Sequence, residues 1–215
     1  MQILTCPAQL QRLEGMLRKS LPLALPVFGA VLNITRGNPG QMEVLVDKWP
    51  EFGAVLARPS REVASGDRGH CRGVCDTVPW HVPGVLRAPV GAPRPWGALW
   101  LDLGVLGAGL EYWAQPAPGV RVGSLHPSHV DLLNDTWRYG GNARSRRYLA
   151  DILERFPQVC LQDSSGQPVA WVLSDSFGTG VHGYTLPEHR RRGHMQVALT
   201  VAAQRAQARG FPSFG

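Results

Sequence analysis

Cysteine and acidic residues are scarce in this sequence, and it has no long apolar run. The four cysteines are scattered rather than regularly spaced: Cys6, Cys71, Cys75 and Cys160. No secretory signal precedes them, so the sequence predicts a reduced intracellular protein and not a disulfide-stapled one. No apolar run reaches the roughly 20 residues that a membrane-spanning helix needs, so we expect no association with a membrane.

The excess of basic over acidic residues indicates which binding partners are favoured. Lysine and arginine number 22 against 16 acidic residues, which gives a net charge of +6. Such a balance favours acidic partners, among them nucleotides, nucleic acid, anionic lipid and coenzyme A. Nucleic acid is not expected, because no recognition motif is present and no aromatic residues alternate with the arginines. A metal site is not expected either, since His70, Cys71, Cys75 and His81 fit no standard zinc spacing.

The most informative stretch is residues 182–210, which reads as a strand, a basic turn and a helix. Pro187 ends the strand at residues 181–186, because proline cannot donate to the ladder. Apolar residues then recur at helical spacing: Met195, Ala198, Leu199, Ala202 and Ala206. Gly210 marks the end of the helix.

The turn in this stretch has the composition of an anion site. Arg190, Arg191 and Arg192 precede Gly193 at the start of the helix. A helix N-terminus offers unpaired N–H groups, glycine allows close approach, and arginine suits phosphate. A diphosphate lying across the turn would satisfy these donors. The alternative is a solvated basic turn that only begins a helix.

The amino-acid sequence of this stretch resembles that of known acyltransferases. An Arg-x-x-Gly turn between strand and helix resembles the acyl-CoA loop of the GCN5-related N-acetyltransferase fold. Residues 184–193 resemble more specifically the glycine N-acyltransferase family. The resemblance recurs, in the family's order, at residues 32–39, 49–52, 131–137 and 140–142. It covers about residues 1–62 and 122–213.

The resemblance implies an α/β (α+β) fold: an acetyltransferase-like mixed sheet flanked by helices, with an N-terminal family lobe. We expect the lobe at residues 1–64 and a partial acyl-CoA-binding core at residues 120–215. Between them, residues 65–119 are rich in glycine and proline and match no part of the family, so we expect them to be largely irregular. The last part of the fold is expected to be missing.

The implied activity is transfer of an acyl group from acyl-CoA to the amino group of glycine or a related small amine. Acyl-CoA would be the co-substrate, no metal would take part, and the protein would be a monomer. The alternative is a catalytically silent relative that binds acyl-CoA, or a truncated product without function. The family is largely mitochondrial, although the N-terminus shows no clear presequence, so a cytoplasmic location stays open.

The resemblance also carries over site residues. The expected acyl-CoA contacts come from the end of the strand and the turn: Leu186, Arg190, Arg191, Arg192, Gly193, His194 and Met195. The family's catalytic glutamate falls at Thr179, which cannot act as a general base. The conceivable substitutes are His182, Glu188 and His189. The alternatives are a packed histidine at position 182 and a surface glutamate at position 188 that pairs with arginine. Three arginines could bind the acceptor's carboxylate or form a solvated helix face: Arg144, Arg146 and Arg147.

Periodicity predicts the remaining elements. Helices are expected over residues 9–19, 128–139 and 145–156, the second with Ser128 as its N-cap and Asp131 completing a capping box. Strands are expected over residues 27–34, 42–46, 52–56, 159–162 and 169–174.

Overall fold

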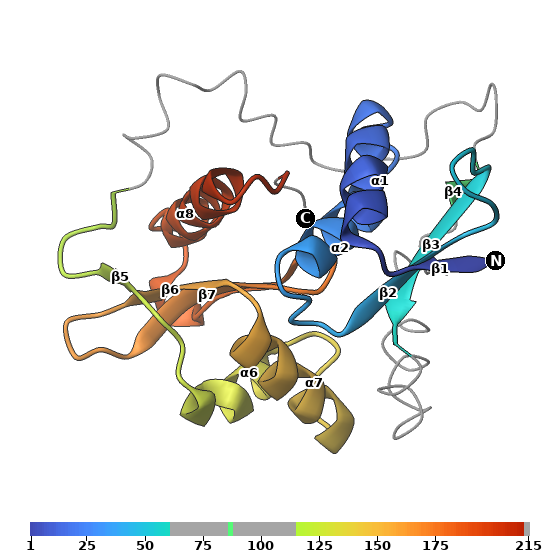
Figure 1. Cartoon of the computed structure of the whole chain (residues 1–215). Coiled ribbons are helices and arrows are strands. Elements are labelled where there is room, and N and C mark those ends of the chain that lie inside the picture. Colours follow the sequence, from blue (N-terminus) through green and yellow to red (C-terminus); the bar gives the residue numbers. More distant parts are fainter. Residues whose placement is uncertain (61–85, 88–114, 213–215) are drawn as a thin grey trace. The chain divides into compact units, whose positions relative to one another are not determined.

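A computed structural model describes residues 1–60, 86–87 and 115–212 (Figure 1). The chain forms two compact units: residues 1–97 with 176–178, and residues 98–175 with 179–215. Most of the predicted irregular segment 65–119, with its Cys71 and Cys75, lies outside the described residues. In the described part, no group of three or more His, Cys, Asp or Glu side chains is placed to hold a metal ion. No helix there is long and apolar enough to cross a membrane.

The first unit contains a four-stranded antiparallel sheet and two helices. The strands follow the order β1 (Gln2–Leu4), β2 (Met42–Val46), β3 (Ala54–Pro59) and β4 (Leu86–Arg87). The helices are α1 (Pro7–Lys19) and α2 (Leu25–Thr35). The predicted helix 9–19 and strand 42–46 are confirmed, and the strand expected at 52–56 lies slightly later.

The predicted strand at residues 27–34 is wrong, because this segment is part of helix α2. Every residue from Val27 to Asn33 is buried, so the run is apolar on all sides and has no period that separates helix from strand. Pro26 lies in the first turn, where a helix tolerates proline. Asn33 reaches beyond the helix and donates from Nδ2 to the Ser176 carbonyl at 2.8 Å.

The second unit contains the other four-stranded antiparallel sheet. Its order is β5 (Arg121–Gly123), β6 (Gln158–Gln162), β7 (Pro168–Ser174) and β8 (Gly180–Thr185). Helix α8 (His194–Ala208) covers one face, and α6 (Val130–Thr136) and α7 (Ala143–Arg155) cover the other (Figure 1). The predicted strands 159–162, 169–174 and 181–186 and the helix 145–156 are therefore confirmed within a residue or two.

Two apolar clusters hold this sheet between its helices. On the α8 side, Val197, Ala198 and Val201 pack with Val159 and Val172. On the other side, Leu133 of α6 and Leu149 of α7 pack with the fully buried Trp171 of β7. Burial of this apolar surface is the main force that fixes the helices on the sheet.

The predicted capping of residues 128–139 is wrong. A short 3-10 turn, Pro127–His129, comes first, and the α-helix begins at Val130. His126 caps the turn: its Nδ1 accepts from the Ser128 N–H at 3.4 Å, and its own N–H donates to His129 Nδ1 at 2.9 Å. The side chains of His126 and His129 thus form the capping box that was predicted for Ser128 and Asp131.

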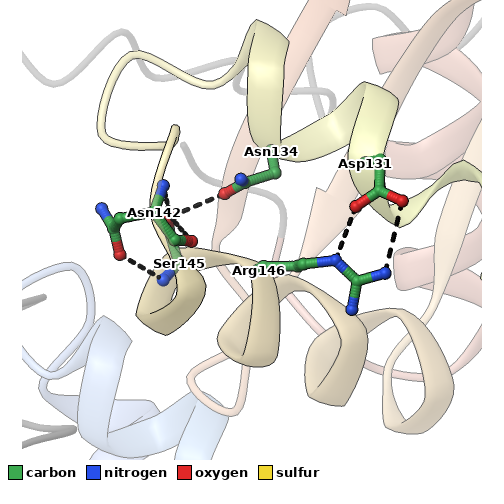
Figure 2. Close-up of polar contacts among 5 residues, drawn as sticks. All are labelled: Asp131, Asn134, Asn142, Ser145 and Arg146. Atoms are coloured by element: carbon green, nitrogen blue, oxygen red, sulfur yellow. Dashed lines mark hydrogen bonds and ion pairs between the residues drawn. The ribbon is translucent and has the colours of Figure 1, made fainter.

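Residues 140–142, Gly-Gly-Asn, form the corner between α6 and α7. Figure 2 shows the polar contacts that Asn142 makes there. The Asn142 side chain accepts from the Ser145 N–H at 2.9 Å and so caps α7. The Ser145 hydroxyl donates to Asn134 Oδ1 of α6 at 2.6 Å. Gly141 has a φ of +84° and donates its N–H to the Asn134 carbonyl at 3.0 Å. Hydrogen bonds of this segment and of Ser145 therefore join the two helices.

Gly140 is the position in this corner where a side chain cannot fit. A Cβ atom there would lie 1.8 Å from the Asn134 carbonyl oxygen. We expect Gly140→Ala to lower the free energy of unfolding by roughly 2 kcal/mol or more, since backbone must move to relieve the clash. Urea unfolding measures the change.

Gly15 supplies the control, because it lies in α1 with nothing within 4 Å of an added Cβ. Gly15→Ala is expected to raise stability by about 0.5–1 kcal/mol, through helix propensity. Equal unfolding midpoints for Gly140→Ala and the parent would contradict the proposed packing of the corner.

Candidate functional site

Strand β8, the turn after it and the start of α8 surround a cavity of about 380 Å³. The turn includes a 3-10 segment, Pro187–His189. The lining residues are Gly183, Tyr184, Thr185, His189, Arg190, Arg191, Gly193, His194, Met195 and Gln196. The structure therefore gathers most of the predicted acyl-CoA contacts around one hollow.

The turn presents the N-terminus of α8 to the cavity. Gly193 is the N-cap with a φ of +76°, and Arg191 also has a positive φ, of 63°. A left-handed N-cap is most easily formed by glycine, and nothing lies within 4 Å of an added Cβ at Gly193. The first N–H groups of a helix have no intrahelical acceptors. Together with the helix dipole, they favour an anion at this place.

The outer edge of β8 supplies backbone groups to the same cavity. The Leu186 N–H donates to the Val169 carbonyl at 3.0 Å, and the pairing then continues with Thr185 opposite Ala170 and Gly183 opposite Val172. In an antiparallel pair the bonded positions alternate, so Gly183 and Thr185 direct their N–H and C=O groups away from β7. β8 is the last strand of this sheet among the described residues.

A register shift marks the start of β8. His182 pairs with Leu173, but Gly180 pairs with Ser174, which leaves Val181 as an extra residue on β8. Such a bulge bends the strand and interrupts the ladder locally. The backbone of β8 is therefore least regular immediately before the residues that line the cavity.

Arg190 is held against the wall of the cavity. Its Nε donates to the Thr185 carbonyl at 3.1 Å, and its Nη2 donates to the Tyr184 hydroxyl at 3.1 Å. The guanidinium carbon lies 5.3 Å from the centre of the Tyr184 ring, which in turn stacks on Trp171. Arg191 is exposed and also lines the cavity, so two fixed positive charges face it.

His194 lies at the base of the helix N-terminus and is 3% exposed. Neither of its ring nitrogens has a hydrogen-bond partner among the described residues. Burial, the neighbouring His189 and Arg192 all lower the pKa of His194. The imidazole is therefore neutral at neutral pH. The buried Thr185 Oγ1 also has no partner in this part of the chain.

Two of the three candidate bases, His182 and Glu188, lie outside the cavity lining, whereas His189 is part of it. His182 is buried, with Nε2 3.0 Å from the Leu133 carbonyl and the rings of Trp137 and Trp171 around it. Burial lowers the pKa of His182 to about 4. Glu188 is exposed in the 3-10 turn, and no ion pair joins it to another described residue. Their catalytic roles stay predictions.

Thr179, where the family's glutamate would fall, belongs to the turn between β7 and β8. Its N–H donates to Asp175 Oδ1 at 3.0 Å, and its carbonyl accepts from the Asp175 N–H at 3.1 Å. The predicted contacts Leu186 and Arg192 do not line the cavity, and Leu186 packs instead beside the cluster around Trp171.

Sequence reasoning missed several lining residues, among them Tyr184 and Gln196, and it considered His189 only as a substitute base. The sequence did contain a signal for Tyr184. This tyrosine lies at the end of a strand, six residues before Arg190, and two such residues can come into contact across a turn. No comparable signal marked Gln196, whose place follows from the start of α8.

Comparison with known proteins places the chain among acyltransferases. Residues 1–77 and 111–157 match the model of a family described as aralkyl acyl-CoA:amino acid N-acyltransferase. The chain is 30% identical to glycine N-acyltransferase of Bos taurus, over 95% of its own length and 85% of that protein's. It is 29% identical to glycine N-phenylacetyltransferase of Bos taurus, over 97% and 86%. Human glycine N-acyltransferase is 27% identical, over 95% and 85%.

Among solved structures, an X-ray structure of a Drosophila protein has a TM-score of 0.55 with 11% sequence identity. The match covers 99% of this chain and 88% of that one. At this identity the likeness concerns the fold alone, and it agrees with the predicted α/β class.

The buried His182 predicts how stability depends on pH. Its pKa falls from the ordinary 6.5 to about 4 in the folded chain. Between these values the unfolded chain binds more protons, so stability is fully present above pH 6.5 and is lost as the pH falls toward 4. The loss is on the order of 3 kcal/mol.

Urea unfolding of the parent and of His182→Gln, at several pH values across this window, measures that contribution. Because His129 and His194 also have lowered pKa values, both chains should lose stability in acid, but the parent should lose more. Identical pH dependence in the two chains would rule out the assigned environment of His182.

Proposed function

Because the chain belongs to the aralkyl acyl-CoA:amino acid N-acyltransferase family, we propose that it transfers an acyl group from acyl-CoA to the amino group of glycine or a related small amine. The observation that carries this proposal is the cavity between β8 and α8. It combines a helix N-terminus, two arginines and the edge of β8, the last strand of its sheet among the described residues. Each of these features matches one chemical part of acyl-CoA.

The diphosphate fits the helix end. Its oxygens would accept from the first N–H groups of α8 and from the arginine side chains, and Gly193 leaves room for their close approach. Arg190 is already oriented by Tyr184, so little side-chain entropy is lost when a phosphate binds.

The pantetheine arm fits the outer edge of β8. This arm carries two amide groups, and an extended chain with amides can pair with a free strand edge as another strand would. Gly183 offers its N–H and C=O groups on that side and Thr185 offers its N–H, while the Thr185 carbonyl accepts from Arg190. A backbone N–H of the same edge would then stabilise the oxyanion that forms on the thioester carbonyl.

In the proposed reaction the amine nitrogen attacks the thioester carbonyl within a ternary complex. The carbon–nitrogen bond forms, the carbon–sulfur bond breaks, and coenzyme A leaves as the thiol, which takes the proton that the nitrogen loses as the amide forms. The attacking ammonium must first lose a proton to a base. His182 and Glu188 are the proposed groups for that step.

The arrangement also supports the second candidate, a silent relative that binds acyl-CoA without turnover. The residues lining the cavity include no aspartate or glutamate. Thr179 stands where the family places its glutamate, and its backbone groups are taken up by Asp175. Binding thus has more support in this chain than proton transfer.

The acceptor's carboxylate requires a cation. The three candidate arginines, Arg144, Arg146 and Arg147, differ in the partners that they already have. Arg146 is paired with Asp131 at 2.5 Å. Arg147 takes part in another interaction. Arg144 has a buried Nε and a buried Nη2 without partners among the described residues. We propose Arg144 as the carboxylate ligand. We also propose a monomer in mitochondria, which rests on the family likeness.

The binding step can be measured by calorimetric titration with acetyl-CoA and benzoyl-CoA. We expect the parent to bind, and Arg191→Ala and Gly193→Asp to bind at least about tenfold more weakly. The first variant removes a positive charge from the helix end, and the second adds a negative charge there. Arg209→Ala is the matched control, because Arg209 follows the opposite end of α8 and lies outside the cavity. No binding by the folded parent would refute the proposal.

The acceptor step can be measured by turnover with glycine. Arg144→Gln is expected to raise the KM for glycine about tenfold or more and to leave the affinity for acyl-CoA unchanged, because only the carboxylate contact is lost. Arg147→Gln on the same helix is the comparison. Turnover that appears only in a Thr179→Glu variant would instead favour the silent relative.

A further inference from the structure

The side chain of His194 lines the cavity, and the proposed function does not yet use its chemistry. The residue is 97% buried, and both Nδ1 and Nε2 lack partners among the described residues. Buried polar groups in folded proteins nearly always have a hydrogen-bond partner, so an exception that lines a cavity indicates a missing ligand. Thr185 Oγ1, buried and unpartnered in the same lining, is a second such atom.

The surroundings define the charge of that ligand. The 3-10 turn contributes His189, whose ring centre lies 6.1 Å from that of His194. The basic turn contributes arginines, Arg192 acting on His194 by its charge. From β8 comes the Tyr184 hydroxyl, and β6 and β7 pack against α8 with apolar side chains. No acidic group of the described chain lines this place, so a protonated imidazole would need an anion from outside.

We infer that the His194 imidazole binds a phosphate oxygen of the acyl-CoA diphosphate and takes up one proton from solvent as it does so. This inference rests on the proposed function and adds a proton to its binding step. The nitrogen that gains the proton donates to the anionic oxygen, and no covalent bond forms or breaks. A neutral, buried imidazole in the free protein becomes an imidazolium paired with phosphate in the complex.

The sign of the resulting pH dependence follows directly. In the free protein the pKa of His194 lies below its ordinary value, because burial, His189 and Arg192 all disfavour the charged ring. The bound phosphate favours the charged ring and raises that pKa. Between the two pKa values binding takes up a proton, so affinity increases as the pH falls, by at most about tenfold per pH unit.

The test is calorimetric titration with dephospho-CoA in buffers of different ionisation enthalpy. Dephospho-CoA keeps the diphosphate but lacks the phosphate monoester, whose own pKa near 6 would obscure the result. The dependence of the binding enthalpy on buffer enthalpy gives the number of protons taken up. We expect a clear fraction of one proton for the parent near pH 6.5, and several-fold tighter binding at about pH 6 than at about pH 8.

Two matched variants assign the proton. His194→Gln keeps hydrogen-bonding groups but cannot be charged, so it should bind more weakly and take up almost no proton. His189→Gln removes the other imidazole that lines the cavity and should keep most of the uptake.

The outcomes are distinct. Tight binding by the parent with no proton uptake, or uptake that persists in His194→Gln, overturns this inference and leaves the proposed function standing. Failure of the folded parent to bind either acyl-CoA or dephospho-CoA overturns both. Because the measurement on the parent needs no variant, the result holds even if His194→Gln folds poorly.

Discussion

The antiparallel pairing of β8 with β7 is the constraint on which the cavity depends. This pairing decides which N–H and C=O groups of β8 bond to β7 and which point away from it, at the edge of the described sheet. It also sets which residues face α8: Gly183 lies under Met195, where an added Cβ would be 3.4 Å from the sulfur atom. The apolar contacts of Val197, Ala198 and Val201 with the sheet then fix the start of α8 beside the end of β8. The cavity results from these two constraints together.

The electrostatics of the second unit separate binding from catalysis. The cavity gathers arginines, histidines and a helix N-terminus, all of which favour an anion. The carboxylates nearby are placed elsewhere: Asp175 is turned into the loop before β8, and Glu188 is exposed to solvent. His182 is satisfied inside the aromatic cluster. The described cavity thus gathers groups that favour an anion, and its lining contains no carboxylate.

The corrections follow from the limits of local patterns. Residues 27–34 lack a period because the whole run is buried, and burial on all sides is a property of the packed unit that the run itself does not reveal. The cap at residues 126–129 uses imidazole nitrogens, which are uncommon in this role, where the pattern favoured a serine. In both cases the residue types were compatible with two structures, and tertiary contacts selected one.

What the sequence by itself determined is the order of elements from residue 130 onward and the basic turn that ends at Gly193, the N-cap of α8. Alternation in the strands, spacing in α7 and α8, and an arginine-rich turn before Gly193 are local properties, and local chemistry is enough to specify them. Only the tertiary structure decided which polar atoms lack partners. His194 lost its access to water because α8 packs on the sheet, and Arg144 differs from Arg146 because Asp131 of α6 lies beside the latter. Such differences depend on atoms brought together from distant parts of the chain, and no local pattern contains them.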